Sequence, residues 1–423
     1  MTRALDSRFW RIWVASAIST LGDGVRTAAL PLLAATLTRD PISVAAVSVA
    51  QGLPWALFAL VSGALVDRLD RRLIMGCTDL FRCAVTAGLV VVVGTHHSSV
   101  AALCVVAFCL GTAETLFDNA SQAILPAVVQ RSALEVANSR LQSVEIVTRD
   151  FVGPPLGAVL FGLAAVAPFA VDSVSFGLGA VLVLTLSGSF RVERTGPPTR
   201  IRTDIAEGLR WLWRHRLIRT MAIMLGVWNL MSAATMAVFV LFALDELGMS
   251  RTGYGLLFTA WAVGGLLGSL VATRVIDRVG HARALLGSVL LGAASYTGMV
   301  LVRQPVVVGG LFLLEGLAVV IWNVITVSAR QALVPPELFG RVNSVYRVIG
   351  WGVLPVGALV GGLVARAFGL RAPFAIAACA LLVMVAWASR IISRATFDAA
   401  FEAGRPVDVD LIEILAEDDA PPP

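Results

Sequence analysis

The stretch Gly63-Ala64-Leu65-Val66-Asp67-Arg68-Leu69-Asp70-Arg71-Arg72-Leu73 decides the fold, because it is a short charged turn at the end of a long apolar segment. A weaker copy, Asp277-Arg278-Val279-Gly280-His281-Ala282-Arg283, ends another apolar segment half a chain later. Turns of this kind join consecutive apolar helices at a membrane surface. Their repetition indicates two homologous helical bundles within one chain.

The composition of the chain indicates that a lipid bilayer surrounds these helices. Of the 423 residues, 57% are hydrophobic and 14% are charged, and the mean hydropathy is +0.83. A soluble domain of this composition lacks the polar residues to cover its surface. Because each membrane-spanning helix needs roughly 20 apolar residues, we predict an all-α polytopic membrane protein with twelve spans. They cover residues 9–36, 42–66, 73–94, 99–128, 138–163, 168–190, 218–244, 252–275, 284–302, 306–334, 343–365 and 371–393.

The placement of arginine predicts how the chain is oriented. Most arginines outside the spans lie on the side of both termini, and the other side carries Arg39, Arg251, Arg303, Arg366 and Arg371. The positive-inside rule then places both termini in the cytoplasm, as an even number of spans requires. The net charge of +5 follows from this topology and does not indicate a nucleic-acid partner.

Short motifs recur in the same order in the two halves of the chain. Ala167-Pro168-Phe169-Ala170 recurs as Ala372-Pro373-Phe374-Ala375, and Gln122-Ala123-Ile124-Leu125-Pro126 recurs as Gln331-Ala332-Leu333-Val334-Pro335. Two pseudo-symmetric six-helix bundles are expected from such a duplication. We predict four segments: an N-terminal bundle over 1–190, a cytoplasmic linker with an amphipathic helix over 191–217, a C-terminal bundle over 218–394, and an acidic disordered tail over 395–423. The linker is either a simple strap between the bundles or a regulatory part.

The charged turn resembles the loop between helices 2 and 3 of the major facilitator superfamily, which reads Gly-x-Leu-x-Asp-Arg-x-Gly-Arg-Arg/Lys. The chain supplies Gly63, Leu65, Asp67, Arg68, Arg71 and Arg72, and departs at Asp70, where the family has glycine. The resemblance covers residues 9–394 and implies a secondary transporter that works by alternating access. In that family the aspartate of this loop latches helix 11, a role that the resemblance carries to Asp67. It also suggests a second latch between Asp277-Arg278 and helix 5, with the arginines serving either as latch residues or as topology anchors.

A second motif lies in the fifth predicted span. Gly153-Pro154-Pro155-Leu156-Gly157 resembles the Gly-Pro-x-x-Gly motif of antiporters in the superfamily. Glycines permit close helix packing, and prolines bend a helix. The resemblance to the motif, carried by Gly153, Pro154 and Gly157, favours export, although ordinary close packing explains the same residues.

Ionisable residues within the spans are the candidate functional side chains, because charges at bilayer depth are costly. Glu315 has no charged neighbour in its own span and is the first candidate for proton coupling, with a hydrogen-bonded structural glutamate as the alternative. Asp23 and the carboxylate pair Glu114 and Asp118 are further candidates, and a partner such as Arg149 would weaken the case for that pair. Helical spacing pairs Asp79 with Arg82 and Glu145 with Arg149 as structural ion pairs, and it also places Arg26 beside Asp23.

Finer details resemble the macrolide-efflux and siderophore-exporter branch of the superfamily. The shared stretches are Leu21-Gly22-Asp23-Gly24, Ala29-Leu30-Pro31-Leu32, Asp79-x-x-Arg82, Gly111-Thr112-Ala113-Glu114 and Asp204-Ile205-Ala206-Glu207-Gly208-Leu209-Arg210-Trp211. This resemblance implies a monomeric bacterial plasma-membrane transporter, favoured as a proton-coupled exporter of hydrophobic or amphipathic compounds such as antibiotics. A siderophore or other metabolite exporter, an importer or uniporter, and a transport-inactive sensor or scaffold are the alternatives.

Neither an enzyme nor a cofactor is expected. No Gly-x-x-x-x-Gly-Lys motif is present, and the four histidines lie in predicted loops without a metal-binding cluster. The partners that we expect are the lipid bilayer, protons and a small substrate. Aromatic residues are candidates for substrate contact as well as for packing: Trp55, Phe58, Trp228, Phe239, Trp261 and Trp322.

Overall fold

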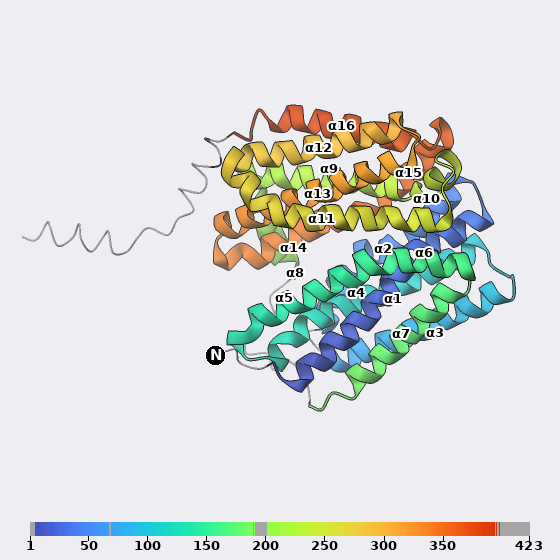
Figure 1. Ribbon diagram of the computed structural model, residues 1–423. Coiled ribbons are helices and arrows are strands. Elements are labelled where there is room, and N and C mark those ends of the chain that lie inside the picture. Colours follow the sequence, from blue (N-terminus) through green and yellow to red (C-terminus); the bar gives the residue numbers. More distant parts are fainter. Residues whose placement is uncertain are drawn as a thin grey trace, which may run out of the picture.

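The computed structural model describes residues 5–66, 69–188, 190, 201–393, 395 and 397, and these residues form helices and connecting turns without β-strands. The helices gather into two bundles (Figure 1). The first bundle, which we call the N-lobe, contains α1 (Ser7–Leu37), α2 (Pro41–Val66), α3 (Arg71–Gly94), α4 (Val100–Val128), the 3-10 turn η1 (Arg131–Ala133), α5 (Leu134–Glu145), the π-helical η2 (Ile146–Val152), α6 (Gly153–Leu163) and α7 (Ala167–Leu184).

The second bundle, which we call the C-lobe, follows a short connecting helix. It contains α9 (Arg216–Met236), α10 (Phe239–Leu241), the π-helical η3 (Phe242–Glu246), α11 (Arg251–Val279), α12 (His281–Leu301), α13 (Pro305–Leu333), α14 (Pro336–Gly352), α15 (Leu354–Phe368) and α16 (Ala372–Ala388). The connecting helix α8 (Ile201–Arg214) packs against α14. There the guanidinium of Arg341 donates to Glu207 Oε2 at 2.6 Å.

In the part of the chain that the structure describes, twelve helical spans cross the two lobes. Ten helical runs in the described residues are long and apolar enough to cross a membrane. The other two spans are α1, which carries the charged residues Asp23 and Arg26, and α16, an apolar helix of 17 residues. The predicted class, an all-α protein with many membrane-spanning helices, is therefore confirmed.

Several spans depart from the predicted boundaries where proline interrupts the helix. The span predicted over 138–163 starts at Leu134 and is π-helical from Ile146 to Val152, directly before Pro154-Pro155. Proline lacks the N–H that donates the backbone hydrogen bond of an α-helix. The π-helical segment before the two prolines accommodates this missing hydrogen bond. The span predicted over 343–365 starts earlier, at Pro336, and breaks at Val353 before Pro355.

Two further spans end earlier than predicted or change their helical form. The span predicted over 168–190 ends at Leu184. The span predicted over 218–244 leaves α-helical geometry after Met236 and continues through α10 into η3. Side-chain caps help to fix the starts of α4 and α11, where the hydroxyls of Ser99 and Ser250 accept hydrogen bonds from backbone N–H groups.

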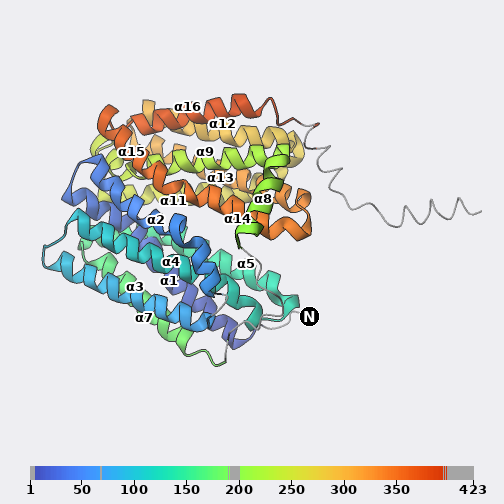
Figure 2. The same ribbon diagram turned by 180° about the vertical axis from the view of Figure 1, so that it is seen from behind.

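The two lobes meet at one face of the molecule and diverge at the other (Figures 1 and 2). We call the diverging face, where α1 begins and α16 ends, the terminal face. At the opposite face α2 packs against α15, and α6 packs against α11. The structure is thus closed at the face away from the termini.

Charged side chains cross between the lobes at this closed face. Arg39 in the α1–α2 turn lies 2.9 Å from Asp245 of η3, and its neighbour Asp40 lies 3.6 Å from Arg366 of α15. Hydrogen bonds from Ser43, with a smaller contribution from Arg366, hold the pKa of Asp40 below its ordinary value of 3.8. The carboxylate of Asp40 therefore stays ionised at neutral and mildly acidic pH. Its ion pair with Arg366 persists over the same pH range.

Candidate functional site

A cluster of charged side chains fills the centre of the N-lobe. Arg26 on α1 is 3% exposed, and its guanidinium lies 2.7 Å from Asp23 Oδ1 and 3.3 Å from Asp172 Oδ2. It also lies 3.9 Å from Glu114 Oε2 on α4. Helical spacing predicts the contact with Asp23, whereas the contact with Asp172 on α7 has no local signal because it joins distant parts of the chain.

Arg82 on α3 is the second buried guanidinium of this cluster. It lies 3.6 Å from Asp79, as the i,i+3 spacing leads us to expect, and 3.8 Å from Asp23. The rings of Phe117 and Phe176 face it with centroids at 4.8 and 5.1 Å. Aromatic faces stabilise a desolvated cation, so both carboxylates and rings hold Arg82 in place.

Arg149 is the third guanidinium, and its partners differ from the predicted ones. The i,i+4 spacing predicts an ion pair with Glu145, but among the described residues Arg149 instead lies 3.4 Å from Asp23, 3.6 Å from Glu114 and 4.0 Å from Asp118. The reason is close packing against α1. Gly24 has no side chain, so the backbone of Arg149 lies directly against it, and the guanidinium reaches three carboxylates at once.

The N-lobe charge cluster therefore contains more carboxylates than guanidiniums. Its members are Asp23, Arg26, Asp79, Arg82, Glu114, Asp118, Arg149 and Asp172. Three arginines face five carboxylates, which leaves two carboxylates in excess when all are ionised. Like charges in a poorly hydrated interior disfavour complete ionisation, so the cluster is chemically suited to hold and release protons.

The antiporter-like motif positions this cluster through close packing inside the N-lobe. A Cβ atom added at Gly153 would lie 2.7 Å from the Gly24 carbonyl carbon, and one added at Gly157 would lie 2.9 Å from Val25 Cα. The motif therefore brings α6 and η2 against α1, with Pro154 facing the space between the lobes. Its measured contacts are packing contacts, and its link to export stays a prediction.

Replacing Gly157 by valine is expected to destabilise the N-lobe strongly. Overpacking of this kind lowers the free energy of unfolding by about 1–3 kcal/mol. The atoms that a valine side chain would meet belong to the backbone of α1 and not to a flexible side chain. The measurement is the yield of monodisperse protein in size-exclusion chromatography together with its melting temperature. Gly88→Val is the matched control, because nothing lies within 4 Å of a Cβ at that position; equal behaviour of the two variants would contradict the expectation.

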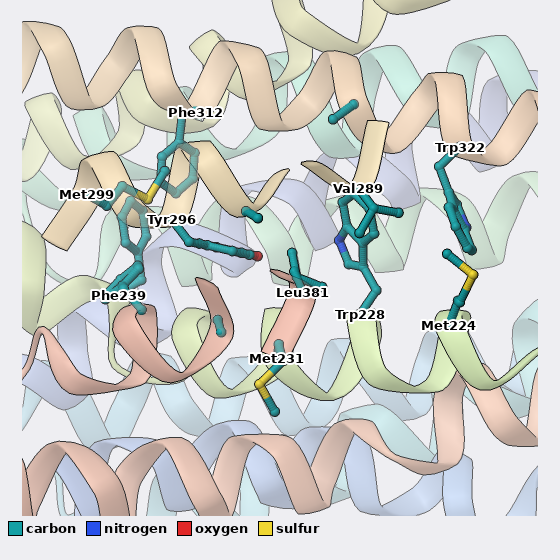
Figure 3. Close-up of a cluster of buried hydrophobic side chains, with 14 of the residues drawn as sticks. Met224, Trp228, Met231, Phe239, Val289, Tyr296, Met299, Phe312, Trp322 and Leu381 are labelled. Carbon is teal, nitrogen blue, oxygen red and sulfur yellow. The ribbon is translucent and has the colours of Figure 1, made fainter. Parts of the chain in front are cut away.

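Glu315 is the buried carboxylate of the C-lobe. It lies on α13, is 6% exposed, and accepts a hydrogen bond from Trp261 Nε1 on α11. Among the described residues it forms no ion pair, in contrast to the carboxylates of the N-lobe charge cluster. The hydrophobic core of the C-lobe contains Trp228, Tyr296 and Trp322 (Figure 3), and Trp228 and Trp322 line the same cavity as Glu315.

A cavity of about 290 Å³ lies between the two lobes and is lined by both. The N-lobe contributes Thr27, Arg149, Asp150 and Pro154. The C-lobe contributes Glu315 with an aromatic lining of Trp228, Phe258, Trp261, Phe312 and Trp322. Arg149 thus links the cavity to the N-lobe charge cluster.

A second cavity continues the first toward the terminal face. Its volume is about 440 Å³, and it shares Leu225, Asn229, Ser232, Trp322 and Asn323 with the first. It continues past Arg330, Tyr346 and Arg347, between the last part of α13 and the middle and last part of α14. The two adjoining cavities therefore extend from the lobe interface toward the terminal face.

The structure brings only some of the predicted site residues to this cavity. Glu315 lines it, as do three of the aromatic candidates, Trp228, Trp261 and Trp322. Trp55 instead stacks on Trp351 of the other lobe with ring centroids 4.9 Å apart, and Phe239 packs within the C-lobe core. Glu114, Asp118 and Asp23 are not among the residues that line this cavity, but each lies within 4.0 Å of Arg149, which does line it.

The predicted latch residues that the structure describes lie at the terminal face. Asp67 and Arg68 fall outside the described residues, and Gly63 lies in the last turn of α2, which ends at Val66. Asp70, the departure from the family pattern, caps α3 by accepting hydrogen bonds from the N–H groups of Arg72 and Phe190 at 2.9 and 3.2 Å. This geometry explains why aspartate is compatible with the turn.

The remaining latch candidates divide between the two lobes. Arg71 begins α3, and the guanidinium of Arg72 donates to the carbonyl of Leu186 at 2.6 Å, which ties α3 to the end of α7. Asp277 and Arg278 are exposed at the end of α11. Because the lobes diverge at this face, the latch role of all these residues stays a prediction.

Comparison with known proteins agrees with this arrangement. The family model described as "Transmembrane secretion effector" matches residues 5–420. The chain belongs to this family of the major facilitator superfamily. The family assignment places the protein in a class of transporters rather than of enzymes.

Relatives of this family member include named efflux proteins. The multidrug efflux pump Tap of Mycobacterium tuberculosis is 29% identical over 380 residues, which cover 86% of this chain and 88% of Tap. Macrolide efflux protein A of Streptococcus pyogenes is 23% identical, over 86% of this chain and 91% of that protein. A bacterial homologue of the iron transporter ferroportin, solved in an inward-facing state, has the same fold with a TM-score of 0.75 and 17% identity, covering 93% of this chain and 100% of that chain.

Proposed function

We propose that this member of the transmembrane secretion effector family exports hydrophobic or amphipathic small molecules in exchange for protons. The observation that carries the proposal is the cavity between the lobes, which has an aromatic lining and an ionisable group on each side. Glu315 lines it from the C-lobe, and Arg149, at the edge of the N-lobe charge cluster, lines it from the other lobe. The named efflux activities of Tap and of macrolide efflux protein A support the direction of transport.

Alternating access follows from the way the lobes meet. The cavity reaches toward the terminal face, while α2, α15, α6 and α11 close the opposite face. With the termini in the cytoplasm, as the arginine distribution predicts, the cavity opens to the cytoplasm and can load substrate there. Rocking of one lobe against the other then exposes the same cavity to the outside.

Proton exchange supplies the energy through the buried carboxylates. Protonation removes a negative charge from a largely buried carboxylate and so changes the electrostatic balance of the cavity wall. A proton taken up from the outside can in this way replace the substrate during the return step. An excess of carboxylates over arginines in the N-lobe charge cluster gives that lobe the same capacity.

Reconstitution in liposomes tests the proposal directly. A panel of antibiotics, dyes and siderophores is first screened for efflux in a host that lacks its own exporters, with and without a proton uncoupler. A transported compound is then followed in liposomes with an imposed pH difference and an internal pH-sensitive dye. We expect substrate and protons to move in opposite directions. Substrate flux that does not change when the pH difference is collapsed would refute proton exchange, and inward accumulation in cells would identify an importer.

Glu315→Gln is expected to reduce uphill transport at least about tenfold. The amide keeps the shape of the side chain and its capacity to accept from Trp261, but it cannot take up a proton at this site. Downhill exchange of an uncharged compound from the panel should continue. Glu337→Gln on α14 is the matched control, because Glu337 is exposed. Full uphill transport by Glu315→Gln would remove this residue from the coupling mechanism.

A further inference from the structure

We propose that the C-lobe wall of the cavity binds a lipophilic organic cation, such as a quaternary phosphonium or ammonium ion or a protonated tertiary amine. Glu315 would be its counter-ion, and Trp228, Trp261 and Trp322 would form its aromatic walls. This inference rests on the proposed function in one respect, that the cavity between the lobes receives the substrate. It adds the charge and the chemical class of that substrate.

The first argument is the uncompensated charge of Glu315. Its carboxylate is 6% exposed, and the described residues place no guanidinium within ion-pair distance of it. The indole N–H of Trp261 donates one hydrogen bond, which satisfies part of the carboxylate but does not neutralise it. A buried charge requires a partner. Because the fold supplies none at Glu315, the partner must be mobile, either a proton or a cationic ligand.

The second argument is the nature of the walls around this carboxylate. Trp228 and Trp322 lie with ring centroids 5.7 Å apart and planes inclined by 40°, and Phe258 and Phe312 extend the aromatic surface. Figure 3 shows the indoles of Trp228 and Trp322 and the ring of Phe312 along the same C-lobe interior. Aromatic faces attract cations and desolvate them. A small hydrated ion would lose its water at such walls without replacement, so an organic cation fits better.

The third argument concerns Arg149, the positive group on the N-lobe side. A free guanidinium in the wall would repel a cation and favour an anion. Arg149, however, lies within 4.0 Å of carboxylates from Asp23, Glu114 and Asp118, so its charge is already compensated. The adjacent Asp150 adds a carboxyl group to the same cavity wall. The charges of the lining therefore favour a cation over an anion.

The size of the space limits the ligand. The cavity of about 290 Å³ is at the lower end of the range of roughly 300–1,000 Å³ that small-molecule sites occupy. A compact cation fits beside Glu315, and the remainder of a larger compound can extend into the adjoining, more polar space of about 440 Å³.

Equilibrium binding of tetraphenylphosphonium tests the inference without any transport. Radiolabelled tetraphenylphosphonium is titrated against purified protein in lipid nanodiscs, and its partition into protein-free nanodiscs is subtracted. Tetraphenylborate, an anion of nearly the same shape, serves as the charge-reversed competitor. We expect saturable binding that unlabelled tetraphenylphosphonium displaces and tetraphenylborate does not. Equal displacement by the two ions would overturn the assignment of a cation site.

Variants of the site locate the binding. Glu315→Gln is expected to bind at least about tenfold more weakly, Trp322→Leu about fivefold more weakly, and Glu337→Gln like the unaltered protein. Glu315→Asp keeps the charge and should retain most of the affinity even if Glu315→Gln is poorly folded. Unchanged affinity of a monodisperse Glu315→Gln protein, or loss of binding in Glu315→Asp equal to that in Glu315→Gln, would overturn the role of Glu315.

The binding and transport experiments fail independently. Binding of tetraphenylphosphonium through Glu315, together with flux that ignores a pH difference, would keep the cation site and refute proton exchange. Proton-driven flux of another compound, together with Glu315→Gln binding tetraphenylphosphonium normally, would refute the cation site and keep the transport proposal.

Discussion

Replacing Gly362 by leucine is expected to reduce transport more than tenfold and to hold the two lobes apart at the face opposite the termini. A Cβ atom at this position would lie 2.7 Å from Ala45 Cβ, 3.1 Å from the Pro41 carbonyl oxygen and 3.2 Å from Ile42 Cα. These atoms belong to α2 of the other lobe, and two of them are backbone atoms that cannot rotate away. A leucine side chain therefore blocks the contact between α15 and α2 on which closure of this face depends.

Spin-label distances check this expectation separately from transport. In a cysteine-free background, labels at His97 and Arg303, exposed residues of the two lobes at the closed face, report the separation of the lobes. Gly362→Leu should shift the distance distribution to longer values. Gly287→Leu on α12 is the matched control, since nothing lies within 4 Å of a Cβ there. An unchanged distribution with normal transport would show that α2 and α15 do not need this close approach.

Replacing Arg26 by methionine is expected to destabilise the N-lobe by about 3–5 kcal/mol, the usual cost of removing one partner from a buried ion pair. Methionine preserves much of the volume but leaves the carboxylates of Asp23 and Asp172 without the guanidinium that lies 2.7 and 3.3 Å from them. The side chain is 3% exposed, so water cannot take over its role.

A second substitution tests whether charge explains the loss. Among the described residues Asp172 pairs only with Arg26, whereas Asp23 keeps Arg82 and Arg149. Adding Asp172→Asn to Arg26→Met therefore removes the carboxylate that has lost its partner and should recover a large part of the stability. Thermal unfolding of the purified proteins in detergent provides the measurement. Arg274→Met is the control, because Arg274 is an exposed arginine whose guanidinium donates to its own helix. A double variant no more stable than Arg26→Met would show that packing, rather than charge, governs this site.

Much of the fold can be predicted from the sequence because membrane spans depend on local composition. Runs of about 20 apolar residues need a helical backbone in lipid, and the charged turns at Arg71 and Asp277 mark where two of these helices meet water. The i,i+3 pairs Asp23–Arg26 and Asp79–Arg82 are equally local, since helical geometry alone brings such residues together.

The contacts that build the site are not local. Arg149 approaches Asp23, Glu114 and Asp118 rather than Glu145, because η2 packs against Gly24 on α1. No spacing along the chain encodes that approach. The same holds for Asp172, because its contact with Arg26 joins two residues that are 146 positions apart in the chain.

The amino-acid sequence by itself determined that the helices are apolar enough for a lipid bilayer, the approximate positions of the spans, and the ionisable residues that lie within them. Each of these properties depends on composition or on spacing within one helix. Only the tertiary structure decided which carboxylates Arg149 contacts, that no arginine of the described residues pairs with Glu315, and which aromatic rings line the cavity beside it. Those properties depend on helix packing between segments far apart in the chain, where a single glycine sets how closely two backbones approach.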